Sequence, residues 1–128
     1  MTQKRRPSPF DQTQGLGSAH EGVGHWWMQR VTAVALVPLT LWFAAALIAH
    51  VRSDYSAFVL WLGSPLATVL MALLLVALFY HMALGLQVVV EDYIHDNRRK
   101  IPAVIAIRLG SFALAVAGLI AVLRIALH

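Results

Sequence analysis

The chain has 128 residues, of which 59% are hydrophobic and only 12% are charged. A soluble domain of this size carries about 25% charged residues, so the composition argues against a soluble enzyme and predicts an all-α membrane protein. There are no cysteines, which excludes disulfides, thiolate iron–sulfur ligation and cysteine-based zinc sites within this chain. The net charge of +4 lies in clusters beside the apolar tracts, with no basic stripe interleaved with aromatic residues, so we expect no nucleic-acid partner.

The chain opens on a polar arm, residues 1–24, which contains prolines and glycines. It has no apolar core of the kind found in signal peptides. We expect this arm to lack regular structure on its own and to lie on a partner. His25-Trp26-Trp27-Met28-Gln29-Arg30 follows at the predicted water–lipid boundary, where tryptophan is favoured.

Residues 25–128 predict a membrane anchor of three helices, with spans at about 31–50, 66–90 and 102–127. Each tract holds the roughly 20 mostly apolar residues that a membrane helix needs. Pro38 lies near the middle of the first span, where proline is tolerated and can bend the helix. Residues 56–62 predict a short interfacial turn before the second span.

The lysines and arginines divide unevenly between the two sides of the predicted bundle. By the positive-inside rule, the richer side is cytoplasmic. The N-terminus and second loop are therefore predicted in the cytoplasm, and the C-terminus in the periplasm. The richer side holds Lys4, Arg5, Arg6, Arg30, Arg98, Arg99, Lys100 and Arg108, and the other side holds Arg52 and Arg124.

His81 lies deep inside the second span. It precedes Glu91 by ten positions, which puts it roughly 15 Å below the interface and near the middle of the bilayer. An ionisable group at that depth indicates a functional site, because its burial is costly without a partner. The imidazole could be hydrogen-bonded to a neighbouring helix, or it could be an axial ligand of haem iron.

Other polar residues extend this pattern to the cytoplasmic edge of the span. Gly85 and Asp92 share a helical face with His81, since eleven residues return to within about 20° of the start. Glycine permits the close approach of a macrocycle or of another helix. Tyr93 can donate a hydrogen bond at the boundary, although Asp92-Tyr93 could equally be a solvated, membrane-anchoring helix end. Arg30 lies at the same depth and could pair with a haem propionate or with lipid head groups.

The spacing from His81 to Asp92-Tyr93 resembles the hydrophobic membrane anchor of succinate dehydrogenase (respiratory complex II). Arg30-Val31-Thr32-Ala33 at the start of the first span is similar to that family as well, and residues 24–33 resemble its bacterial branch close to mitochondria. The predicted architecture of three spans is similar to that family too, so the resemblance covers nearly the whole chain.

The resemblance implies a role for each matching residue. His81 would be one axial ligand of haem b, and the second histidine would come from the cytochrome b556 subunit. Arg30, and His25 upstream of it, would approach the haem. Tyr93 would hydrogen-bond a ubiquinone carbonyl, with Asp92 supporting proton delivery.

The resemblance also implies partners and a location. The partners are the cytochrome b556, iron–sulfur and flavoprotein subunits and membrane lipid, and the location is the bacterial cytoplasmic (inner) membrane. Because the chain has no flavin or nucleotide motif, it cannot oxidise succinate itself.

Three other interpretations remain open. The chain could be a small transporter subunit that uses His81 and Asp92 as a proton relay, although relays usually need ionisable groups on several spans. It could be a purely structural anchor, in which His81 only packs. It could also anchor a fumarate reductase.

Overall fold

The computed structural model describes residues 17–128, and its described side chains begin at Val23. Residues 1–16, which make up most of the predicted polar arm, lie outside the described residues. The described part is entirely helical, as predicted. Its elements are α2 (Gly17–Ala49), α3 (Tyr55–Leu62), α4 (Pro65–Tyr93) and α5 (Asn97–Ala126).

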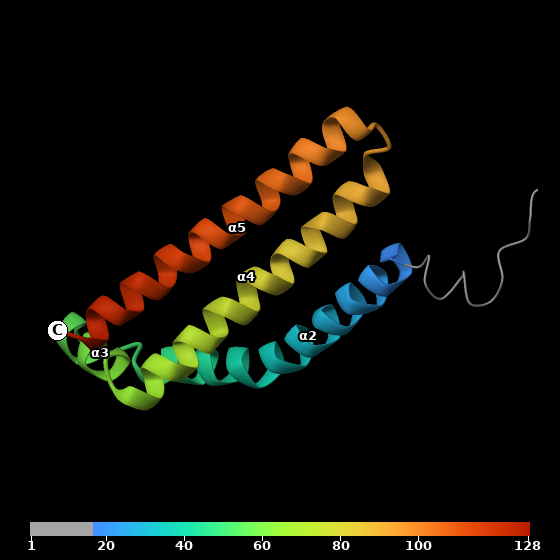
Figure 1. The fold of residues 1–128 in the computed structure, drawn as a ribbon. Helices are drawn as coiled ribbons and strands as arrows, with labels where there is room; N and C mark the ends of the chain where they lie inside the picture. Colours follow the sequence, from blue (N-terminus) through green and yellow to red (C-terminus); the bar gives the residue numbers. More distant parts are fainter. Residues whose placement is uncertain (1–16) are drawn as a thin grey trace, which may run out of the picture.

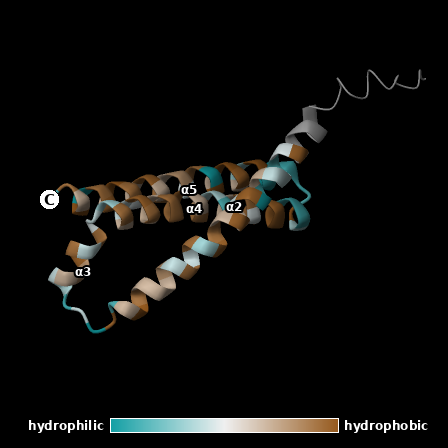
Figure 2. Cartoon of the chain, turned by 90° about the horizontal axis from the view of Figure 1, so that it is seen from below, coloured by the Kyte–Doolittle hydropathy of each residue, from teal (hydrophilic) through white to brown (hydrophobic). Residues whose placement is uncertain are grey.

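Three of these helices are long and apolar enough to cross a membrane, over Val23–Ala49, Pro65–Tyr93 and Asn97–Ala126. Hydrophobic colouring runs along α4 and α5, and hydrophilic colouring marks the connections at both ends of the bundle (Figure 2). A helix of 29 residues, such as α4, is about 43 Å long, whereas the hydrocarbon core is about 30 Å thick. The helix ends therefore extend beyond the apolar layer.

The helices begin earlier than the apolar tracts that predicted them. Residues 17–24, expected to be irregular, belong to α2, because a helix already formed by the first span extends without a new nucleation step. The third helix begins at Asn97 rather than near Pro102. The Asp96 carboxylate caps it by accepting a hydrogen bond from the Arg98 amide at 3.1 Å, and the charged first turn then lies outside the apolar layer.

α4 is the central helix, because α5 packs along it and α2 packs against it as well (Figure 1). α2 curves in Figure 1, consistent with Pro38, which removes one backbone hydrogen bond from the helix interior. The bundle has two ends. We call the end with the α4–α5 connection and the start of α2 the Tyr93 end, and the end with α3 and the C-terminus the α3 end.

The described basic residues near the helix ends sort between the two ends as the sequence predicts, whereas Lys4, Arg5 and Arg6 lie outside the described residues. Arg98, Arg99 and Lys100 lie in the first turn of α5 at the Tyr93 end, whereas Arg52 and Arg124 lie at the α3 end. Which of the two ends faces the cytoplasm stays a prediction.

The buried core lies toward the α3 end. Leu62 of α3, Met71 and Leu74 of α4, and Val122 of α5 form one buried cluster. Gly118 lets α5 approach α4 closely, because a Cβ there would lie 3.2 Å from a Leu75 methyl carbon. The Tyr93 half of the bundle contributes no residue to this cluster.

Candidate functional site

His81 is partly buried in the second half of α4 and faces α2. Its Nδ1 lies 3.0 Å from the hydroxyl oxygen of Thr32, which is only 7% exposed. The same hydroxyl lies 2.7 Å from the Met28 carbonyl oxygen and 3.1 Å from the Gln29 carbonyl oxygen. His81 therefore has a polar partner on the neighbouring helix through one ring nitrogen, while the described residues offer no partner to Nε2.

Gly85, one turn beyond His81, borders open space. Outside its own helix, no described atom would lie within 4 Å of a Cβ built at this glycine. No described helix of this chain therefore fills the gap, which leaves room for a group from outside the chain.

Asp92 and Tyr93 form the last turn of α4 and are both exposed, Tyr93 to 82%. Asp92 lies eleven residues beyond His81, a rise of about 16 Å along the helix, on the same face. Tyr93 is turned by about 120° from that face. The structure therefore separates two polar positions along α4, one in its second half and one in its last turn.

Arg30 and His25 lie on different sides of α2. Arg30 is two residues from Thr32, so it lies on nearly the opposite face, and its guanidinium carbon is 5.2 Å from the Trp26 ring centroid. His25 is seven residues from Thr32 and shares its face to within about 20°. Its Nε2 is buried without a hydrogen-bond partner among the described residues. The structure therefore brings His25, and not Arg30, to the side of α2 that faces α4.

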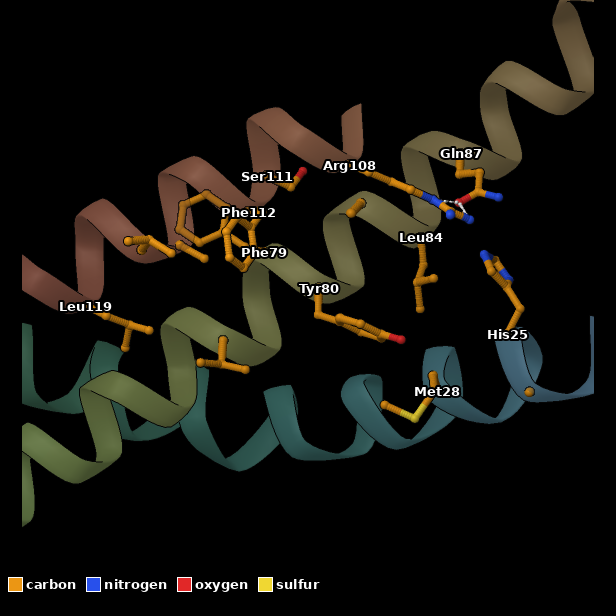
Figure 3. A pocket seen from close by; sticks show the side chains of 15 residues that line it. His25, Met28, Phe79, Tyr80, Leu84, Gln87, Arg108, Ser111, Phe112 and Leu119 are labelled. Atoms are coloured by element: carbon orange, nitrogen blue, oxygen red, sulfur yellow. Dashed lines mark hydrogen bonds between the residues drawn. The ribbon is translucent and has the colours of Figure 1, made fainter. Parts of the chain in front are cut away.

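A groove of about 690 Å³ runs between α2 and α5 over the surface of α4 (Figure 3). Its walls are mainly apolar, and the His25 ring points across it toward Gln87 and Arg108. The residues that line it are Gly24, His25, Met28, Val76, Phe79, Tyr80, Ala83, Leu84, Gln87, Arg108, Ser111, Phe112, Ala115, Val116 and Leu119. His81 is not among them, although Met28, whose carbonyl oxygen accepts from the Thr32 hydroxyl, does line the groove.

A polar chain crosses the Tyr93 end of this groove. Arg108 donates to the Gln87 side-chain oxygen from Nε at 3.2 Å and from Nη2 at 3.1 Å. The Gln87 amide nitrogen in turn donates to a Glu91 carboxylate oxygen at 3.1 Å. Arg108 is therefore connected through Gln87 to an acid at the membrane edge.

Sequence reasoning singled out neither Thr32 nor Gln87 as a site residue. Thr32 was visible only as part of the Arg30-Val31-Thr32-Ala33 element, and Arg108 only as a topology signal. The only sequence signal for such residues is a hydroxyl or amide inside an apolar span, since these groups often hydrogen-bond across membrane helices.

The described residues contain no group of three or more His, Cys, Asp or Glu that could hold a metal ion. A haem iron that takes one imidazole from this chain needs no such group.

Residues 4–125 match the model of the family described as "Succinate dehydrogenase/Fumarate reductase transmembrane subunit". The match covers nearly the whole chain. The chain belongs to this family. The resemblance carried by His81, Asp92-Tyr93 and residues 24–33 is thereby confirmed at the level of the family.

Curated proteins that are similar to this chain support the same family. The chain is 36% identical over 109 residues to the "Succinate dehydrogenase hydrophobic membrane anchor subunit" of Rickettsia bellii (strain RML369-C), an alignment that covers 85% of this chain and 87% of that protein. It is 29% identical over 110 residues to the protein of the same name from Paracoccus denitrificans, with 86% and 85% covered. No solved structure matches the chain significantly.

Proposed function

We propose that this chain is the membrane anchor subunit of a succinate dehydrogenase, that it supplies one axial ligand to a haem b, and that it forms part of a ubiquinone-reduction site. The observation that carries the proposal is His81. Its imidazole lies within an apolar span of a chain of this family. The Nδ1 atom is hydrogen-bonded to Thr32, and the Nε2 atom has no partner among the described residues.

The residues around His81 fit a haem group. Imidazole nitrogen is a common axial ligand of haem iron, and the Thr32 hydrogen bond leaves one ring nitrogen available. Gly85 provides the open space beside it that a macrocycle requires. When bound, haem b supplies one-electron redox chemistry, and what this chain contributes is an oriented ligand in a water-poor setting.

Groups for the haem propionates would come from the N-terminal part of α2. His25 faces α4 and has a buried ring nitrogen in need of a partner, so it could donate to a carboxylate at the Tyr93 end. Arg30 could pair with a propionate as well, as arginine commonly does with carboxylates. Arg30 lies on nearly the opposite face of α2 from Thr32, so this contact would need a propionate that extends to that face.

Tyr93 and Asp92 would serve the ubiquinone headgroup. A quinone must approach the edge of the apolar layer to meet soluble redox centres, and both residues are exposed at that depth. The Tyr93 hydroxyl can donate a hydrogen bond to a quinone carbonyl oxygen. Asp92 can carry a proton from water toward the reduced oxygen, since ubiquinone takes up two protons with its two electrons.

The proposed complex includes a cytochrome b556 subunit, an iron–sulfur subunit and a flavoprotein subunit. The second histidine ligand would come from the cytochrome subunit. The basic first turn of α5, Asn97-Arg98-Arg99-Lys100, lies at the same end as Tyr93 and offers a cationic surface to the soluble subunits. The same charges favour a cytoplasmic orientation for this end in the bacterial inner membrane.

The proton-relay interpretation has less support. About 16 Å of helix separates His81 from Asp92, and among the described residues no hydrogen bond of either side chain leads toward the other. The Arg108–Gln87–Glu91 chain ends on a permanently charged guanidinium, which does not release protons. A fumarate reductase anchor remains compatible with the family description, which names both activities.

The test is affinity purification of the tagged chain in mild detergent, followed by a count of the polypeptides and a reduced-minus-oxidised visible spectrum. The expected product contains a flavoprotein, an iron–sulfur protein, a second small membrane subunit and a b-type haem band. If the partner subunits co-purify but no haem band appears, the role of His81 as a haem ligand is refuted and the anchor function stands. Neither partners nor haem would refute the proposal as a whole.

A further inference from the structure

We infer that Thr32 is a positioning residue for His81, which fixes both its tautomer and the plane of its ring. The inference rests on the proposed function, since the orientation matters only if His81 holds a metal. It starts from three contacts of one buried hydroxyl, two with carbonyl oxygens of its own helix and one with His81, which joins α2 to α4.

The direction of the hydrogen bond follows from counting protons. A threonine hydroxyl has one proton and two lone pairs. The Met28 carbonyl oxygen, at 2.7 Å, is the nearest acceptor, and the Gln29 carbonyl oxygen lies on the same side at 3.1 Å. With its proton directed to those carbonyls, the Thr32 oxygen is left to accept, so the His81 Nδ1 must carry the proton that joins them at 3.0 Å.

This assignment determines which nitrogen is available to a metal. A neutral imidazole carries a proton on one nitrogen and a lone pair on the other. With the proton on Nδ1, the lone pair is on Nε2, and the described residues do not occupy that atom. A hydrogen bond from the opposite N–H also makes the ligating nitrogen more basic and fixes the ring orientation.

The surroundings of Thr32 hold its hydroxyl in one position. Thr32 is only 7% exposed, and its β-branched side chain is held by two carbonyl oxygens of its own helix. The packing of α2 on α4 therefore sets the rotation of the His81 ring. A hydroxyl that served only to join the helices would not influence the electronic properties of a metal bound at Nε2.

The experiment compares Thr32→Val with the wild type in the whole complex, because valine keeps the shape of threonine and removes the acceptor. We expect haem affinity to fall about tenfold, as is typical when a supporting hydrogen bond is lost. We also expect a higher midpoint potential, since a less basic imidazole stabilises ferric iron less well. The low-spin electron paramagnetic resonance signal should shift, because the ring plane is no longer fixed.

Two further variants act as controls. Thr32→Ser keeps the hydroxyl and should restore the haem content, potential and resonance signal of the wild type. Thr40→Val removes a threonine hydroxyl from the same helix, one that bonds only the Leu36 and Val37 carbonyls, at 2.6 and 3.2 Å. It should leave all three measurements unchanged. If Thr32→Val does not assemble, Thr32→Cys, with its weaker sulfur acceptor, should give a potential above that of the wild type.

The outcomes separate the two proposals. A wild-type complex that lacks haem refutes the haem part of the proposed function. Haem in the wild type, with its loss in His81→Ala but unchanged affinity, potential and resonance in Thr32→Val or Thr32→Cys, overturns the role of Thr32 alone. Equal shifts in Thr32→Val and Thr40→Val would also overturn it, because they would show a general effect of losing a hydroxyl from α2.

Discussion

The two ends of the helical bundle differ in what their side chains do. At the α3 end, the rings of Trp42 and Phe58 lie against Trp61, with centroids 5.8 and 5.5 Å away, beside the buried aliphatic cluster. At the Tyr93 end, the last turn of α4 and the first turn of α5 are exposed and charged. The buried aliphatic cluster thus lies at one end, whereas the other end carries polar groups that can meet other molecules.

Two histidines make the same contrast at the level of single residues. His50, which directly follows α2 at the α3 end, bonds the Ala46 carbonyl oxygen of that helix at 2.9 Å, and its ring centroid lies 4.5 Å from that of Trp61. His81 instead bonds a side chain of another helix and has open space one turn away. The environment of His50 is that of a packing residue, whereas the environment of His81 leaves a ring nitrogen for a ligand.

The largest expected effect is the loss of haem in His81→Ala. Removal of a direct ligand should weaken haem binding by more than the roughly 10–100-fold that loss of a supporting hydrogen bond costs. The measurement is the b-type band per complex after purification. His50→Phe, which keeps a packing ring at the other end, should retain the full band. An unchanged band in His81→Ala would place the ligand elsewhere.

The next effect concerns stability and belongs to the α3 end. Leu62→Ala removes a 7% exposed side chain from the core cluster and should destabilise the folded bundle by about 2–5 kcal/mol. Thermal unfolding of the solubilised complex measures this change. Leu60→Ala, on the same short helix but 80% exposed, is the matched control and should change the melting temperature little. Equal losses in both variants would contradict the division between a packed and an open end.

A smaller and purely kinetic effect is expected at the Tyr93 end. Tyr93→Phe removes one hydrogen-bond donor and should slow ubiquinone reduction about tenfold, the equivalent of one lost hydrogen bond, with haem content unchanged. Succinate-dependent quinone reduction by the purified complex measures it. Tyr55→Phe offers a close control, because Tyr55 is 83% exposed against 82% for Tyr93 but lies at the α3 end. Wild-type kinetics in Tyr93→Phe would exclude this tyrosine from the quinone site.

The sequence predicts the fold more completely than the site. The three spans follow from apolar tracts of sufficient length, and the position of Pro65 at the start of α4 follows from its missing N–H. The true helix ends do not follow, because hydropathy carries no signal for helical turns outside the apolar layer. There the start of α5 is determined by the Asp96 cap instead.

Within the site, the depth of His81 and the edge position of Asp92 and Tyr93 follow from spacing along one helix. The contact between Thr32 and His81 does not, because it depends on how α2 and α4 are rotated against each other. Helices that are apolar on all sides have no polar face to reveal that rotation. The different sides of α2 taken by His25 and Arg30 relative to α4 are hidden from the sequence for the same reason.

The smallest predicted effect tests whether the polar chain at the Tyr93 end contributes to stability. Gln87→Met removes the acceptor of both Arg108 hydrogen bonds and the donor to Glu91, at a cost of at most about 1 kcal/mol, because the groups are partly exposed. The double variant with Arg108→Met should be no less stable than Gln87→Met alone, since Gln87→Met already removes both Arg108 hydrogen bonds. Thermal unfolding of the four proteins gives the coupling energy directly. Strictly additive losses would mean that the hydrogen bonds between Gln87 and Arg108 do not contribute to stability.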